Sequence, residues 1–569
     1  ILTYVSYSVL TSAASRFLLV PPAAEWRELV EKTIDAPSPI YLNVFNKKSA
    51  YRRRLILASS NPAYYTNYTN NKVKICPEDK ADKAGFIAAM KPKYPQDNTR
   101  RKIFGFFHPF AHAAGGGERV LWEAVKETLH NDIANVVAIY TGDVGVTPEQ
   151  ILDNASHKFQ IDNLDEKRIV FVYLQKRHLI TALHWPRFTL IGQAIGSLLL
   201  TWEAIFNLSP DVWCDTLGLP FGYPLVSLCL RIPIVSYVHY PVVSSDMLNK
   251  LNLLNVKDIG KYIYWSAFKF LYTRVGPFVD IIMTNSTWTH DHIASIWFLN
   301  SDVRTVYPPC GTEEIILRIQ NQKPAAKEDY ILKIAQFRPE KRDAMVLEEY
   351  AAFFKQTKAD PARIPKLVLL GSTRGAEDEQ LVRELRAQAE TLAITSHVQL
   401  VVNAPYLEMV AWLRRSKYGL NAMWNEHFGI AVVEYLASGC IPLVHASAGP
   451  LADIVVPWDD KNHRLSDKFY QNRTGFFFRA RVDPDYPGKT IVDKSTGENV
   501  EFSELHAVFE QICLLTEAEQ QRISARGRDL ALHKFSNKEF DDKWQRVVTE
   551  AKALEIKKRE SRHTVDKLY

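Results

Sequence analysis

Two glutamates, Glu426 and Glu434, are the side chains with the clearest potential for chemistry in the sequence. Glu426 lies in a polar segment that ends at Gly429, and an apolar run over residues 430–438 follows, so we expect a loop, a glycine turn and then a helix. Glu434 would lie about one turn into that helix. One carboxylate could then bind a ribose diol and the other a sugar hydroxyl, while the helix N-terminus faces phosphate.

A run of three glycines, Gly115, Gly116 and Gly117, is a second candidate site. It follows an apolar run over residues 103–107 and precedes residues 118–129, which are predicted to be helical. Glycines let the backbone approach a bulky or charged ligand, and the free N–H groups of the helix would point at that ligand. A flexible turn is the alternative, but the position directly after a predicted strand favours a binding loop.

The segments that position these residues alternate short apolar runs with stretches of helix length, which is typical of parallel sheets covered on both faces. The first series of predicted strands lies at 103–107, 136–140, 169–174, 212–217, 232–239, 281–285 and 303–307. After a polar linker at 320–329, the second series lies at 331–336, 367–370, 398–402, 418–423 and 441–444. The pattern predicts two doubly wound α/β domains with ligand sites at the carboxyl ends of their strands.

The composition is that of a soluble globular protein with a mild excess of basic residues. Hydrophobic residues make up 47% and charged residues 24%, which excludes a disordered chain, a collagen-like fibre and a polytopic membrane protein. The 70 Lys and Arg residues against 64 Asp and Glu leave a net charge of +6. A dedicated nucleic-acid binder would need a larger and more clustered excess, so a phosphorylated ligand or an anionic membrane face is favoured.

The six cysteines are spread along the chain without the spacing of a zinc site or a redox pair. Most of them lie in apolar runs, where a free cysteine behaves as a small hydrophobic residue. We therefore expect free thiols in a reducing compartment.

Three segments have the composition of membrane-associated helices. Residues 1–20 are largely apolar but include Arg16, and the basic cluster downstream (47, 48 and 52–54) would favour the cytoplasmic side of a membrane, unless it is only a solvated charge run. Residues 188–208 are apolar, and residues 261–272 are rich in aromatic side chains. Each of the two later segments alone is more often a core helix, but the three segments together favour peripheral or monotopic membrane attachment.

The Glu426/Glu434 pair, the turn at Gly429 and the glycine run together resemble the retaining glycosyltransferases of family 4, which have the GT-B fold. The resemblance extends over about residues 101–552. Members that use GDP-mannose to extend dolichol-linked oligosaccharides, at the cytosolic face of the endoplasmic reticulum, are similar in the segments FGFFHPFAHAAGGGERVLW, SYVHYP, NSTWT, AQFRPEKR and NEHFGIAVVEYLASGCIPLVHASAGP.

The resemblance implies a role for each matching residue around the donor. Glu434 corresponds to the glutamate that binds the nucleotide ribose, and Glu426 to the catalytic glutamate near the donor sugar. The backbone of Phe428, Gly429 and Ile430 would contact sugar and phosphate. His239 corresponds to a catalytic histidine placed near the sugar, although a histidine at a strand end is more often a hydrogen-bonded core residue.

The donor diphosphate is where the sequence departs from the family pattern. Lys341 matches the lysine that neutralises the diphosphate, but Gln336 replaces the arginine usual five residues before it, and Arg338 lies two residues after Gln336. We expect Arg338 to take over the phosphate contact because it supplies charge and bidentate donors.

The GT-B resemblance implies two facing Rossmann-like domains and a division of the chain into four parts. Residues 1–100 would form an N-terminal extension with a membrane-associated segment and its basic flank. Residues 101–320 would be the acceptor domain, 321–535 the nucleotide-sugar domain and 536–569 a charged C-terminal helix.

The resemblance also implies a metal-independent transfer with retention of configuration and no cofactor besides the donor, GDP-mannose. The expected partners are a dolichol-diphosphate-linked oligosaccharide, the endoplasmic reticulum membrane and other mannosyltransferases of the same pathway, with no nucleic acid. Another lipid-linked sugar transferase of the same family is the nearest alternative. A catalytically inactive membrane scaffold is a further one, against which the intact Glu426, Glu434 and Lys341 argue.

Overall fold

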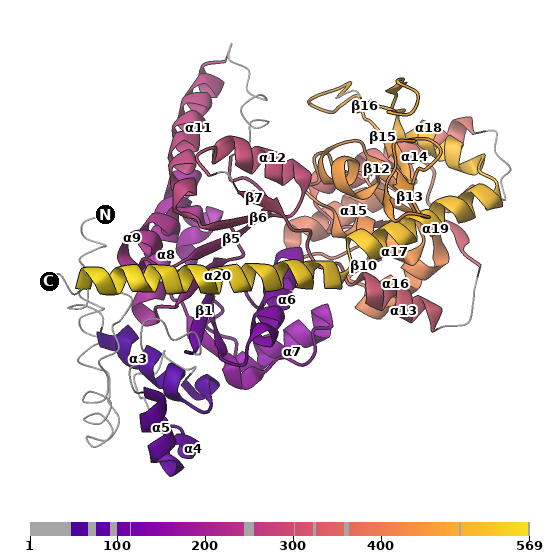
Figure 1. The fold of residues 1–569 in the computed structure, drawn as a ribbon. Coiled ribbons are helices and arrows are strands. Elements are labelled where there is room, and N and C mark those ends of the chain that lie inside the picture. Colours follow the sequence, from indigo (N-terminus) through magenta and orange to yellow (C-terminus); the bar gives the residue numbers. More distant parts are fainter. Residues whose placement is uncertain are drawn as a thin grey trace. The chain divides into compact units, whose positions relative to one another are not determined.

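The computed structural model describes residues 47–566 except 66–74, 91–99, 114, 244–254, 301, 322–325, 358–363 and 489–490. The chain folds into two units (Figure 1). The first comprises the chain up to Thr284, His292–Arg304 and the chain from Asp541, and the second comprises Asn285–Asp291 and Thr305–Phe540. The predicted segment 1–20 lies outside the described residues.

The first unit is built on a seven-stranded sheet in the order β3-β2-β1-β4-β5-β6-β7, whose pairs from β3 to β6 are parallel. Its strands are β1 (Lys102–Phe107), β2 (Asn135–Thr141), β3 (Ile169–Tyr173), β4 (Val212–Asp215), β5 (Ile234–Val238), β6 (Ile281–Thr284) and β7 (Val303–Thr305). Its helices are α3 (Lys47–Ala58), α4 (Pro77–Ala81), α5 (Lys83–Met90), α6 (Gly116–Asn131), α7 (Pro148–Phe159), α8 (Thr189–Asn207), α9 (Tyr223–Leu230) and α11 (Val256–Val275). Two further helices, α12 (Thr287–Ile296) and α20 (Asn537–Asp566), contain residues of both units.

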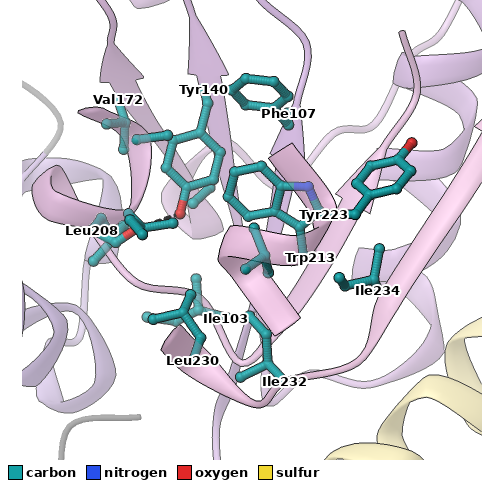
Figure 2. Packing of buried hydrophobic residues seen from close by; sticks show 14 of the residues in the cluster. Ile103, Phe107, Tyr140, Val172, Leu208, Trp213, Tyr223, Leu230, Ile232 and Ile234 are labelled. Carbon is teal, nitrogen blue, oxygen red and sulfur yellow. Dashed lines mark hydrogen bonds between the residues drawn. The ribbon is translucent and has the colours of Figure 1, made fainter. Parts of the chain in front are cut away.

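Large aromatic side chains fill the core beside the central strands of this sheet (Figure 2). The Trp213 ring lies 4.9 Å from that of Phe107 and 5.5 Å from that of Tyr140, and the Tyr140 hydroxyl donates to the carbonyl of Leu208. Gly105, in the middle of β1, makes room for this packing because a Cβ there would lie 2.7 Å from the Tyr140 ring. Burial of such rings supplies much of the driving force for folding.

Helix α3 packs against the rest of the first unit through charged side chains. Arg52 and Arg53 are buried, and the Arg53 guanidinium forms an ion pair with the buried Asp211 and donates to the carbonyl of Ser209. Arg52 donates to the carbonyl of Asn207 at 3.3 Å. The interpretation of this basic cluster as a solvated run or a membrane flank is therefore wrong for Arg52 and Arg53. Their guanidinium groups are buried and bind partners inside the first unit.

The second unit is built on a six-stranded parallel sheet in the order β10-β9-β8-β11-β12-β15. Its strands are β8 (Glu328–Ile334), β9 (Lys366–Gly371), β10 (Val398–Val402), β11 (Ser416–Asn421), β12 (Ile441–His445) and β15 (Phe476–Phe478), and two short antiparallel pairs join β13 (Trp458–Asp459) to β14 (Arg464–Leu465) and β16 (Ile491–Val492) to β17 (Asn499–Val500). Its helices are α13 (Thr312–Gln320), α14 (Asp343–Gln356), α15 (Ala376–Thr391), α16 (Tyr406–Arg415), α17 (Ile430–Ser438), α18 (Leu505–Cys513) and α19 (Glu517–Lys534).

The predicted α/β organisation is confirmed, with a strand at each predicted position and two corrections. The edge strand β15, paired with β12, and the short strands β13, β14, β16 and β17 were not predicted. Glu328 and Asp329, assigned to the linker, are the first residues of β8. Residues 188–208 form α8, and residues 261–272 are part of α11. Among the described residues, α8 is the one helix long and apolar enough to cross a membrane.

Candidate active site

The loop that carries Glu426 connects β11 to α17 at the carboxyl edge of the second sheet. Tyr435 fixes α17 there, since its hydroxyl accepts a hydrogen bond from Ile334 N and donates to Leu420 O in the two adjacent strands. Gly429, directly before the helix, has φ of +110°, a conformation that favours glycine. Gly449 lets a second loop pass behind the first, because a Cβ at this position would lie 2.6 Å from the carbonyl oxygen of His427.

Lys341 and Glu426 form an ion pair at this edge. Lys341 ends the short turn after β8, and its Nζ lies 2.6 Å from Glu426 Oε2, which also accepts from Asn421 Nδ2 at 3.4 Å. Burial works to raise the pKa of Glu426, but the charge and hydrogen bond of Lys341 outweigh it, so the pKa lies below its ordinary value. The carboxylate is therefore ionised at neutral pH.

The residues predicted to make the backbone and ribose contacts lie directly before α17 and on its first turns. The Phe428 ring is buried against the rings of Tyr307 and Phe535. Within the loop, Phe428 therefore offers a ligand its backbone and not its ring. Within the described part of the chain no side chain caps the helix, and its first turn has no acidic residue. The first N–H groups of a helix have no partners within it, and together with the helix dipole they favour an anion. Glu434 is buried on the same helix, with 8% of its surface exposed.

Gln336 and Arg338 differ in what they contact. The side-chain amide of Gln336 lies against the guanidinium of Arg374, with its oxygen 2.8 Å from Nη2 in the orientation that satisfies both groups. Arg338 is half-buried, and its guanidinium has no hydrogen-bonding or ionic partner within the described part of the chain. Arg338 is thus the one of the two whose donors remain available to a diphosphate.

A buried cluster behind the Glu426 loop was missed by the sequence analysis. His445 Nε2 lies 2.7 Å from Asp483 Oδ2, and Arg342 Nη1 lies 2.6 Å from Asp483 Oδ1. His445 Nδ1 also contacts Ser447 Oγ, which accepts from Asn425 N next to Glu426. Burial would raise the pKa of Asp483, but His445 and Arg342 hold it at about 2. This cluster fixes the loop, and no local pattern in the sequence points to it.

The glycine run of the first unit is held by a glutamate in the helix that follows. The predicted helix is confirmed as α6 and begins two residues earlier than predicted, at Gly116. Gly115 N donates to Glu118 Oε2 at 2.7 Å, and Glu118 Oε1 lies 3.3 Å from Nε2 of the fully buried His108. Burial works to raise the pKa of Glu118, but these partners lower it below its ordinary value.

His239 lies beside this glycine run. It follows β5, and its Nε2 is 2.9 Å from the carbonyl oxygen of Thr216, whose Oγ1 is 2.8 Å from His108 Nδ1. A Cβ on Gly117 would lie 3.5 Å from His239 Nε2. The ends of β1, β4 and β5 therefore bring His239 and the glycine run together, as Lys341 and Glu426 are brought together in the second unit.

Three groups of side chains in the described residues could hold a metal ion, and none includes a predicted site residue. The groups are His463, Asp529 and His533; Glu349, Glu504 and His506; and Glu123, Glu127 and Asp541.

Family models match both halves of the chain. The model described as ALG11 mannosyltransferase N-terminus matches residues 101–297, and that described as glycosyl transferases group 1 matches residues 316–468. Among curated proteins, the GDP-Man:Man(3)GlcNAc(2)-PP-Dol alpha-1,2-mannosyltransferase of Debaryomyces hansenii is 42% identical over 100% of this chain and 99% of its own. That of Candida albicans is 41% identical over 100% and 98%, and that of Mus musculus is 38% identical over 64% and 76%.

Solved structures with the same fold have little sequence identity to this chain. Sucrose-phosphate synthase from Thermosynechococcus elongatus superposes with a TM-score of 0.54 at 12% identity, covering 80% of this chain and 100% of that protein. The trehalose-6-phosphate synthase OtsA superposes with a TM-score of 0.53 at 12% identity, covering 79% and 99%. The likeness establishes a GT-B fold, as predicted.

Proposed function

Because the chain belongs to the family of GDP-Man:Man(3)GlcNAc(2)-PP-Dol alpha-1,2-mannosyltransferases and is a GDP-mannose-dependent α-1,2-mannosyltransferase, we propose that its donor is bound by Lys341, Arg338 and the first turns of α17. The observation that carries this assignment is the meeting of Lys341 and Glu426 beside the uncapped N-terminus of α17. The acceptor is dolichol-diphosphate-linked Man(3)GlcNAc(2), and the proposed reaction adds two α-1,2 mannoses to it in succession.

In the proposed arrangement each part of GDP-mannose has its own partner. Glu434 accepts hydrogen bonds from the ribose hydroxyls, and Glu426 accepts from a mannose hydroxyl. Lys341 and Arg338 neutralise the diphosphate, for which the N–H groups of Gly429 and Ile430 supply further donors. The site thus places positive charge where the leaving group becomes more negative, without assigning that role to a metal.

The proposed chemistry retains the configuration of the transferred sugar. The bond from mannose C1 to the β-phosphate oxygen breaks, and the 2-hydroxyl oxygen of the acceptor mannose bonds to C1 on the same face. The acceptor proton passes to an oxygen of the departing GDP, so no protein side chain has to act as the base. Donors held in place before the reaction lower the barrier because they need no reorganisation as charge develops.

We assign His239 and the run of Gly115, Gly116 and Gly117 to the sugar and acceptor side of the reaction. The His108–Glu118 contact holds the glycine run, and the Thr216 carbonyl orients His239 by accepting from its Nε2. With Nε2 protonated, the ring presents a fixed tautomer.

The lipid-linked acceptor makes the protein a dolichol-pathway enzyme of the endoplasmic reticulum membrane. We propose that it works on the cytosolic face. All six cysteines are free thiols, and four of them are buried, which fits a reducing compartment.

The experiment that tests the proposal uses purified full-length protein, GDP-mannose and a lipid-linked trimannosyl acceptor. Mass spectrometry should find two added hexoses, and a linkage-specific α-1,2-mannosidase should remove both. A product with a single added mannose would contradict the two successive additions, and transfer from a UDP-sugar in place of GDP-mannose would contradict the donor assignment.

A further inference from the structure

The outward face of α11 is apolar along most of its length. Ile259, Tyr262, Ile263, Phe270 and Leu271 recur at the three- and four-residue spacing of one helix face, and between 40% and 63% of each residue is exposed. On a helix at the surface of a soluble protein this face is ordinarily polar. Contact of this face with an apolar environment outside the protein would therefore be favourable.

The inward face of α11 is already occupied by the first unit. Phe268 and Tyr272 are buried, and their rings lie 5.0 Å and 6.4 Å from that of Phe221 in the turn before α9. Trp297 also packs against Tyr272, at 5.4 Å between ring centroids. The exposed stripe is thus a second apolar face, additional to the one that holds the helix in place.

The beginning of α8 extends the stripe. The exposed ring of Phe188 lies 5.7 Å from that of Tyr264 in α11, and Ile191 N donates to the Tyr264 hydroxyl at 3.2 Å. Leu183, shortly before α8, is 96% exposed. Both helices lie in the first unit (Figure 1). We call the combined surface the α8–α11 face, which consists of Leu183, Phe188, Ile191, Ile259, Tyr262, Ile263, Phe270 and Leu271.

Basic residues border this face. Arg187 and Arg274 are exposed, Lys261 is 60% exposed, and the Arg274 guanidinium lies 4.8 Å from the centre of the Phe270 ring. The single acidic residue in the sequence of α11 is Asp258. Aromatic rings beside lysine and arginine suit the boundary between lipid headgroups and acyl chains, because the rings bury their apolar part and the cations reach anionic headgroups.

Although α8 is long enough to span a bilayer, its packing fixes it on the protein. Gly196 approaches the loop before it so closely that a Cβ would lie 2.1 Å from Leu179 O. Leu200 and Ala204 are fully buried, and the Glu203 carboxylate accepts from Gln175 N and Lys176 N. A helix held in this way would have to leave the core before it could cross a membrane.

We propose that the α8–α11 face inserts into the interfacial layer of the bilayer that carries the lipid-linked acceptor, as an in-plane contact in which α8 does not cross the bilayer. The inference rests on the proposed function for the lipid nature of the acceptor. It further specifies which part of the protein meets the membrane. Insertion brings the first unit, with the glycine run and His239, to the surface from which the acceptor oligosaccharide projects.

Insertion can be measured without activity. In full-length protein with Cys229→Ser and Cys513→Ser, the variants Ile263→Cys and Phe270→Cys each carry an environment-sensitive fluorophore. On vesicles of phosphatidylcholine and phosphatidylinositol, both should shift to shorter wavelength and be quenched more by lipids with the quencher near the headgroup than near the chain end. The matched control is Ile133→Cys in the loop between α6 and β2, which is 85% exposed and outside the face. It should show neither effect.

A second arm separates this inference from the proposed function. The double variant Ile263→Asp/Phe270→Asp should lose about tenfold or more of its transfer to the lipid-linked acceptor in vesicles, because two apolar side chains no longer enter the membrane. Transfer to a water-soluble acceptor analogue should stay as in Ile133→Asp. Absence of quenching at both positions, as expected if a protein partner covers the face, would overturn the inference, and so would an equal loss on both acceptors. If the unmodified protein transferred no mannose to either acceptor, that result would instead contradict the proposed function.

Discussion

Lys341 Nζ lies 2.6 Å from Glu426 Oε2, across 85 residues of sequence. The two side chains follow β8 and β11, which are neighbouring strands of the second sheet, so the topology alone brings them to one edge. Lys341 keeps the Glu426 carboxylate ionised where solvent is partly excluded. A diphosphate bound at the start of α17 would compete with Glu426 for the lysine, which couples donor binding to the position of the carboxylate.

The first prediction concerns the lysine. Lys341→Met should lower the rate of mannose transfer by about a hundredfold or more, because a charge that stabilises the leaving diphosphate is removed while side-chain length is kept. Steady-state kinetics with GDP-mannose measure the effect. The control is Lys417→Met, since Lys417 pairs with Asp329 at 2.8 Å without contacting the Glu426 loop. If Lys341→Met had the kinetics of the wild-type protein, the assignment of Lys341 to the donor site would be wrong.

The second prediction is a pH dependence. The folded pKa of Glu426 lies below its ordinary value of 4.5, so its ion pair with Lys341 is fully formed above that value and is lost as pH falls through the lowered pKa. In Lys341→Met burial dominates, so the pKa of Glu426 should rise and the acid limb of GDP-mannose binding should move to higher pH. Binding titrations from about pH 4 to pH 8 cover the range. An acid limb unchanged by the substitution would show that Glu426 does not control binding.

The third prediction separates Arg338 from Gln336. Arg338→Ala should weaken GDP-mannose binding by about tenfold, the usual cost of one hydrogen bond between charged groups. Gln336→Ala should change it by less than about threefold, because the amide contacts Arg374. Calorimetric titration with GDP-mannose compares the two variants. The opposite order of effects would assign the diphosphate contact to Gln336.

The fourth prediction concerns metal removal. Lys341, Arg338 and the N-terminus of α17 supply positive charge around the proposed leaving group, so we expect dialysis against EDTA to leave the rate of mannose transfer unchanged. Assays of the treated protein with and without added Mg²⁺ or Mn²⁺ measure this directly. A rate that falls with EDTA and returns with either ion would require a metal in the reaction.

The strands could be predicted because each is a short apolar run between segments of helix length. In the two large sheets the exception is β15, which has only the residues Phe476–Phe478 and occurs among turns, so it has no long apolar run. Gly429 was also predictable, since a turn between strand and helix often needs a left-handed residue, and its φ is +110°.

Charged side chains that pair across long stretches of sequence could not be predicted from local patterns. Arg53 pairs with Asp211, 158 residues away, which turns an apparent surface cluster into a buried contact. His445 and Asp483 are separated by 38 residues, and nothing near either residue indicates the other. A buried charge is stable only with a partner, and the fold determines where that partner lies.

The last prediction tests the contact between the glycine run and His239. A Cβ on Gly117 would lie 3.5 Å from His239 Nε2, an ordinary contact, so Gly117→Ala should keep most of the activity. Gly117→Val adds two methyl groups that would displace the ring from the Thr216 carbonyl, and the rate of mannose transfer should fall by about tenfold or more. Gly145→Val is the control, since a Cβ at Gly145 would have no neighbour within 4 Å among the residues that the structure describes. Equal rates in the two valine variants, with both folded by circular dichroism, would show that the His239 ring has no part in the transfer.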